Sequence, residues 1–135
     1  MAILIVEDDA DLLRLTARLL RAWGMPTAVA VDGDEALVLI RKIHPSLILT
    51  DYHMPKFDGV SLARAVRSLG ISTPILLLTA DGDWHIEQQA RDAGVTRVLK
   101  KPIIPEMLRK VIEELYQARP GPDSAGSFDP PDSDI

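Results

Sequence analysis

The sequence has no cysteine among its 135 residues. This absence excludes disulfide bonds, thiol nucleophiles and thiolate-bound zinc, and it suits the reducing cytoplasm, where we expect the protein. Aromatic residues are also scarce, at 4%, so the chain offers a poor platform for stacking bases. The net charge of −5 weighs against binding to a polyanion. We therefore expect no direct contact with nucleic acid.

Long hydrophobic runs are absent as well. The longest stretch without a charged residue runs from Ser68 to Ala80, which is shorter than the roughly 18 apolar residues of a membrane-spanning helix. No basic leader precedes the first acidic residue, Glu7. We expect neither a membrane span nor a secretion signal. The overall composition, with 47% hydrophobic and 26% charged residues, is that of one soluble domain with a real core.

The composition changes abruptly at residue 119. The last 17 residues, 119–135, contain four prolines, two glycines, three serines and four aspartates. A segment of this composition cannot bury enough apolar surface to become ordered. We predict a folded domain over residues 1–118, followed over residues 119–135 by a disordered tail or the start of a linker.

Residues 2–118 alternate between short apolar runs and amphipathic stretches. Five runs predict strands, and two of them, Leu47 to Thr50 and Ile75 to Leu78, are apolar throughout, as in parallel strands covered on both faces. The other three runs are Ala2 to Val6, Thr27 to Val31 and Val95 to Leu99. Short connections and intervening helices predict an α/β fold, a doubly wound five-stranded parallel sheet with five helices.

The helices are predicted from apolar residues repeated three and four positions apart and from the residues that end them. The first is predicted from Leu12 to Trp23 and ends at Gly24. The second begins at Asp32, with Glu35 three residues later, and ends before Pro45; the third runs from Leu62 to Leu69 and ends at Gly70. The fourth runs from near Asp83 to Gly94, and the fifth begins at Pro105.

Polar residues follow four of the five predicted strands: Glu7, Asp8 and Asp9 the first, Asp51 the third, Thr79 the fourth, and Lys100 and Lys101 the fifth. The carboxyl ends of parallel strands lie at one edge of the sheet, where ligands of such folds bind. Clustered carboxylates repel one another unless a cation is present, and an oxygen-only ligand set favours Mg²⁺. A lysine and a hydroxyl opposite could hold phosphoryl oxygens. The pattern therefore indicates phosphoryl chemistry.

Each of these residues also has an ordinary structural explanation. Asp9 is typical of a helix N-cap, Thr79 of a turn, and Lys101 of a solvated strand end. Their joint placement at four strand ends nevertheless favours a site.

Over residues 2 to about 118 the chain resembles the receiver domains of bacterial two-component response regulators. The resemblance rests on four motifs: Ile3-Leu4-Ile5-Val6-Glu7-Asp8, Asp51-Tyr52-His53-Met54-Pro55 followed by Asp58-Gly59, Thr79-Ala80, and Lys101-Pro102. It implies a flavodoxin-like sheet with strand order 2-1-3-4-5. It also implies that Asp51 accepts a phosphoryl group from the phosphohistidine of a sensor histidine kinase or phosphotransfer protein.

The resemblance also implies the remaining roles at the site. Mg²⁺ would be bound by Asp8, Asp51, the backbone carbonyl of His53 and, through water, Glu7. Thr79 and Lys101 would contact the phosphoryl oxygens, and the Lys101-Pro102 bond would be cis. His53 and Asp81 match positions that tune the lifetime of the phosphoryl group.

In this family the switching surface is the fourth helix, fifth strand and fifth helix, here Asp83 to Ala118, which would contact a downstream protein that the sequence does not identify. The chain departs from the family pattern at two places. Val98 replaces the usual aromatic residue three positions before the lysine, and Arg97 replaces an acid that one branch uses in its dimer contacts. We therefore do not assume the dimer of that branch, and a homodimer is one alternative for the assembly of this protein.

Several other functions compete with a phosphoacceptor switch. An aspartyl-phosphate phosphohydrolase would usually have an acid two residues after its nucleophile, where this chain has His53. A flavin carrier would need a first loop that is not acidic. A degenerate receiver, acting only as a binding module, would not need the intact acidic pair with Asp51. We expect no enzymatic turnover beyond the protein's own phosphotransfer and dephosphorylation, in a stand-alone receiver or the N-terminal receiver of a longer regulator.

Overall fold

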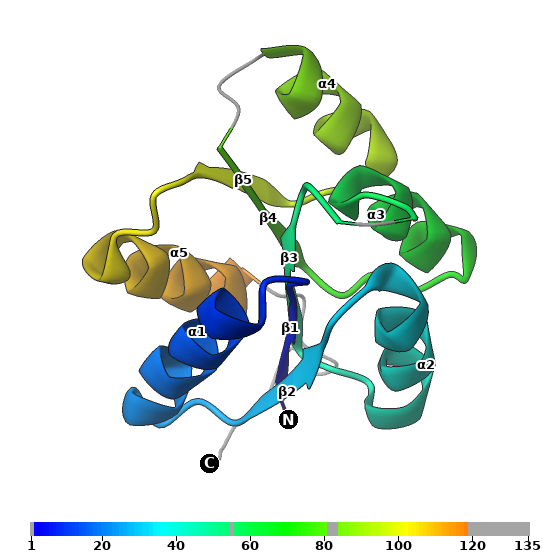
Figure 1. Cartoon of the computed structure of the whole chain (residues 1–135). Helices are drawn as coiled ribbons and strands as arrows, with labels where there is room; N and C mark the ends of the chain where they lie inside the picture. Colours follow the sequence, from blue (N-terminus) through cyan, green and yellow to red (C-terminus); the bar gives the residue numbers. More distant parts are fainter. Residues whose placement is uncertain (1, 55, 81–83, 119–135) are drawn as a thin grey trace.

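The computed structural model describes residues 2–54, 56–80 and 84–118, in which five strands alternate with five helices (Figure 1). The strands are β1 (Ile3–Val6), β2 (Thr27–Ala30), β3 (Leu47–Asp51), β4 (Ile75–Thr79) and β5 (Arg97–Lys100). The helices are α1 (Ala10–Ala22), α2 (Gly33–Ile43), α3 (Gly59–Ser68), α4 (Trp84–Ala93) and α5 (Pro105–Ala118). None of these helices is long and apolar enough to cross a membrane.

The strands form one parallel sheet in the order β2-β1-β3-β4-β5, which confirms the predicted topology. Its register aligns the strand ends that matter for the site. Val6 at the end of β1 lies opposite Thr50 of β3, Asp51 lies opposite Leu78 of β4, and Thr79 lies opposite Lys100. The residues that follow β1, β3, β4 and β5 are therefore neighbours at one edge.

Helices cover both faces of the sheet, with α1 and α5 on one face and α2, α3 and α4 on the other (Figure 1). Each face has its own core of buried side chains. Leu4, Ile48 and Leu77 point toward the three-helix face, whereas Ile3, Leu49 and Leu76 point toward α1 and α5. This burial on both sides explains why β1 is apolar throughout and why β3 and β4 are apolar up to the polar residues at their carboxyl ends.

Aspartates fix the beginnings of three helices on the site side of the sheet. The side chain of Asp9 accepts hydrogen bonds from the N–H groups of Asp11 and Leu12. Asp32 and Asp58 cap α2 and α3 by the same type of bond. The N-cap role expected for Asp9 is therefore confirmed. The side chain of Asp9 caps α1, unlike the two acids before it, Glu7 and Asp8.

The fifth strand begins later than the sequence predicted. The backbone N–H of Val95 donates to the carbonyl of Ala90 at 2.9 Å, so this residue closes α4 after Gly94, whose φ is +94°. Val95 is buried in the core of the three-helix face, and the strand starts at Arg97. Asp81, Asp83 and the predicted tail over residues 119–135 lie outside the described residues.

Candidate functional site

Three carboxylates meet at the carboxyl edge of the sheet. Glu7, Asp8 and Asp51 each offer an oxygen, and these oxygens all lie within 4.8 Å of one another. Glu7 and Asp51 are buried, with 5% and 6% of their surface exposed, whereas Asp8 is exposed. The cluster contains oxygen donors and no histidine or cysteine. This donor set fits a hard divalent cation such as Mg²⁺.

Lys101 reaches into this cluster from the other side. Its Nζ lies 2.6 Å from Oδ1 of Asp51 and 3.7 Å from Oε1 of Glu7. The backbone N–H of Lys101 donates to the carbonyl of Thr79 at 2.8 Å, and the Lys101-Pro102 peptide bond is cis, as the family resemblance implied. One ammonium group therefore lies within ion-pair distance of two of the three carboxylates.

The pKa values follow from this arrangement. Burial acts to lower the pKa of Lys101, but the hydrogen bond and charge of Asp51, together with Glu7, outweigh it, so that the pKa is raised. Burial raises the pKa of Glu7 to about 7; the hydrogen bond from the backbone of Asp9 opposes this rise, and the charge of Asp51 adds to it. Without a metal, Glu7 therefore takes up a proton as the pH falls through about 7.

Thr79 and His53 lie at the same edge, with different exposure. Thr79 ends β4 and is 2% exposed. His53 lies two residues beyond Asp51 with an exposed side chain, and its ring packs edge-on against Tyr52 at a centroid distance of 4.7 Å. The imidazole is thus not part of the carboxylate cluster.

Sequence reasoning missed the packing role of Gly59, although the Asp58-Gly59 pair was noticed as a motif. A Cβ atom at Gly59 would lie 2.5 Å from the carbonyl oxygen of Asp51 and 2.5 Å from Cδ1 of Leu77. The N–H of Gly59 also donates to the carbonyl of Tyr52 at 2.9 Å. The beginning of α3 therefore rests directly on the backbone of Asp51, and only glycine permits this approach.

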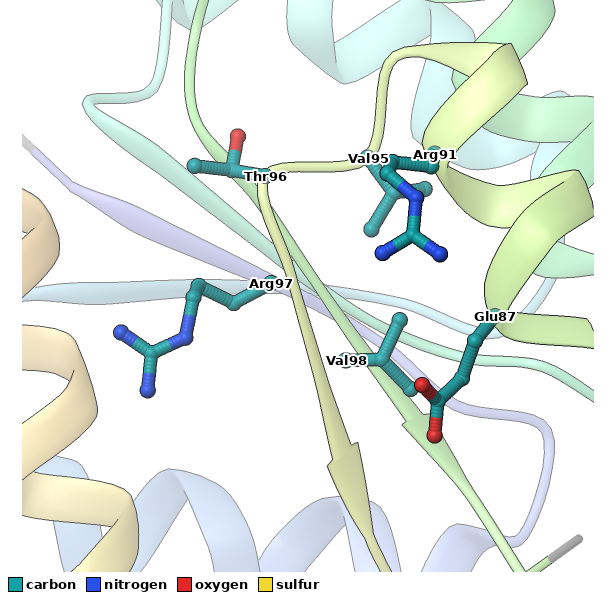
Figure 2. Close-up of a pocket in the computed structure, with 6 residues that line it drawn as sticks. All are labelled: Glu87, Arg91, Val95, Thr96, Arg97 and Val98. Carbon is teal, nitrogen blue, oxygen red and sulfur yellow. The ribbon is translucent and has the colours of Figure 1, made fainter. Parts of the chain in front are cut away.

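Away from the acidic edge, a hollow of about 190 Å³ lies between α4 and β5. Figure 2 shows Val98 and Val95 beneath Glu87 and Arg91 of α4, while Arg97 points away toward α5, where it forms an ion pair with Glu114 at 3.1 Å. Val98 is half-buried. None of the described residues that line this hollow is aromatic.

Comparisons with known proteins agree with the geometry. Residues 3–113 match the response regulator receiver domain family. The chain is 32% identical over 119 residues to the sensor histidine kinase RcsC of Escherichia coli, covering 88% of this chain and 12% of RcsC. It is 35% identical over 106 residues to the DNA-binding response regulator MtrA of Mycobacterium tuberculosis, covering 78% of this chain and 46% of MtrA.

A solved structure shows the same fold. The chemotaxis response regulator CheY4 of Vibrio cholerae superposes with a TM-score of 0.79 at 32% identity, covering 85% of this chain and 98% of that one. The chain spans less than half the length of the two larger relatives. Both matches are nevertheless the size of one domain, and the matched family covers the sheet, the helices and the acidic edge. The chain therefore belongs to the receiver domain family of two-component response regulators.

Proposed function

We propose that this receiver is a Mg²⁺-dependent phosphoacceptor switch and that Asp51 accepts the phosphoryl group. The observation that carries this proposal is the position of the Asp51 carboxylate. Asp51 ends the buried strand β3, and its carboxylate lies next to the acidic pair Glu7 and Asp8 and to the ammonium group of Lys101. The donor would be a phosphohistidine of a sensor histidine kinase or of a phosphotransfer protein.

In the proposed step, a carboxylate oxygen of Asp51 attacks phosphorus. An O–P bond forms and the N–P bond of the phosphohistidine breaks, and the electron pair of that bond stays on the imidazole nitrogen. Lys101 Nζ, now 2.6 Å from Asp51 Oδ1, would pair with an oxygen of the transferred group. The hydroxyl of Thr79 would donate to another oxygen.

The residues that would hold the metal are Asp8, Asp51, the backbone carbonyl of His53 and, through water, Glu7. Bound Mg²⁺ supplies positive charge next to the transferred phosphoryl oxygens. The chain's own contribution is to keep Glu7 and Asp51 buried and close together, so that both carboxylates are oriented before the donor arrives.

Phosphorylation replaces the single charge of Asp51 by about −1.5 to −2. We propose that the readout is the surface of α4, β5 and α5, because β5 leads directly into Lys101. Val98 has no ring to reorient, so the change would be transmitted by Lys101 and by movement of Thr79. The downstream protein would recognise this surface in one of its two states. The phosphohydrolase alternative is not favoured, since His53 offers no second acid.

The test uses a small-molecule phosphodonor with Mg²⁺ and intact-protein mass spectrometry. The wild-type chain should gain one phosphoryl group that alkaline hydroxylamine removes, and Asp51→Asn should gain none. Asp9→Asn is the matched control, because asparagine caps a helix as well as aspartate does, and it should still be labelled. Labelling of Asp51→Asn, or no labelling of the wild type, would overturn the proposal.

A further inference from the structure

The ring of Phe57 lies directly on the backbone of Gly33, the first residue of α2. A Cβ atom at Gly33 would lie 2.3 Å from Cζ of the ring and 2.6 and 2.7 Å from its two Cε atoms. Gly33 is not among the residues with positive φ, so alanine would fit its backbone conformation. Glycine is required at this position only because the ring approaches so closely.

The beginning of α2 is a fixed support for this ring. The backbone N–H of Glu35 donates to Oδ1 of Asp32 at 2.8 Å, and Oε1 of Glu35 accepts from the N–H of Val31 at 2.8 Å. These two bonds tie the first turn of the helix to the two residues before it. Any atom added to Gly33 therefore displaces the ring of Phe57 rather than the helix.

Phe57 belongs to the segment that connects Asp51 to α3. Backbone bonds hold the two ends of this segment: the N–H of Tyr52 donates to the carbonyl of Leu78 at 2.8 Å, and the N–H of Gly59 donates to the carbonyl of Tyr52 at 2.9 Å. Between these ends, Phe57 packs against the core of the three-helix face. Lys56, just before it, has φ +73°, a conformation that is unfavourable for lysine and has to be held by its surroundings.

We propose that Phe57 is a positioning residue for the metal site. Packed on Gly33, it holds the described residues between Asp51 and α3, 52–54 and 56–58, so that the backbone of His53 is presented to Mg²⁺, and it thereby links α2 to the acidic edge. This inference rests on the proposed function. The neighbouring ion pair of Lys56 with Asp34 at 3.8 Å is exposed on both sides, so we give it no part in the effect.

The experiment is a double-mutant cycle on the full chain. Gly33→Ala should displace the ring and weaken Mg²⁺ binding about tenfold, the lower end of the range for residues that support metal ligands. Phe57→Leu removes the outer ring atoms that a Cβ would meet, and it should also weaken binding, because it leaves a gap above Gly33. The double variant should bind Mg²⁺ nearly as well as the wild type, because the new methyl group fills that gap.

Two measurements separate this inference from the proposed function. Calorimetric titration with Mg²⁺ gives the affinities, and hydrogen exchange at the amide of Gly59, without metal, reports the segment directly. The exchange should be faster in Gly33→Ala and restored in the double variant. Gly24→Ala is the control for general destabilisation, since its φ is +81° with no atom near the added Cβ, and it should leave Mg²⁺ affinity unchanged.

If the wild-type protein does not bind Mg²⁺, the proposed function is overturned, and the exchange measurement still tests the contact. If Gly33→Ala changes neither affinity nor exchange, or if the losses in the double variant add, the positioning role of Phe57 is wrong.

Discussion

At the scale of single residues, the decisive feature of the site is an imbalance of charge. Glu7, Asp8 and Asp51 gather at one edge, and Lys101 pairs with two of them, Glu7 and Asp51. The sequence predicted this gathering, because acids and a lysine follow strands that end at one edge. It could not predict that the pKa of Glu7 is raised. That rise comes mainly from the burial of the Glu7 side chain.

The raised pKa of Glu7 predicts how the stability of the metal-free protein changes with pH. The pKa is about 7 in the folded protein against 4.5 for an unperturbed glutamate, so between these values the folded state keeps a proton that the unfolded state has lost. The contribution of Glu7 to the free energy of unfolding is therefore fully present below pH 4.5 and is lost as pH rises toward 7.

Urea denaturation in the presence of a chelator, at several pH values between 4.5 and 8, measures this loss. Glu7→Gln is neutral in both states and should remove the decline across that window. A Glu7→Gln variant with the same pH profile as the wild type would assign the proton to another group.

At the scale of helices and strands, the limits of sequence reasoning lie at contacts between elements. Hydrophobic pattern predicted five strands and five helices, and caps such as Asp32 marked where helices begin. Val95, however, belongs to the turn that closes α4, and its apolar side chain gave the same signal as a strand residue. The packing of Phe57 on Gly33 could not be predicted from the sequence pattern, because the two residues are far apart in sequence.

Arg67 is a second such contact, and it joins α3 to the connection before β4 and to the turn between α4 and β5. Its guanidinium donates to the carbonyl of Gly94 at 2.7 and 3.0 Å, to that of Ile71 at 2.9 Å and to that of Thr73 at 2.8 Å. Burial lowers the pKa of Arg67. The sequence pattern places Arg67 on a helix but does not distinguish it from the other arginines on helices.

Replacing Arg67 by methionine should lower the free energy of unfolding by about 3 kcal/mol, because three part-buried carbonyls lose a charged donor. Arg67→Lys should restore only part of this loss, since lysine cannot fork across several acceptors. The measurement is chemical denaturation, with Arg64→Met, exposed on the same helix, as the matched control. Equal effects of Arg67→Met and Arg64→Met would contradict a role for the fork.

At the scale of the whole molecule, the parallel sheet places together residues as distant in sequence as Glu7 and Lys101. The strand order β2-β1-β3-β4-β5 puts β1, β3 and β4 in the middle, and these buried strands carry or precede the acids and Thr79. The apolar pattern predicted a doubly wound parallel sheet, but the order of its strands came from the family resemblance, because strand order is a property of packing that no local pattern records.

This arrangement predicts that Mg²⁺ stabilises the entire domain, since the unfolded chain does not hold its ligands together. At a free concentration one hundred times its dissociation constant, the metal should add about 2.7 kcal/mol, which raises the Tm of a domain of this size by about 10 °C. The increase should be larger at pH 8 than at pH 6, because Mg²⁺ favours the ionised form of Glu7, whose pKa is about 7.

Scanning calorimetry with and without Mg²⁺, at both pH values, measures this effect. Asp8→Asn should lose most of the shift while leaving the metal-free Tm close to that of the wild type, because Asp8 is exposed and its removal lessens repulsion within the cluster. Asp9→Asn should keep the full shift. A Tm increase that survives in Asp8→Asn would mean that Mg²⁺ stabilises the fold from outside the acidic edge, and the assignment of that edge as the metal site would then be wrong.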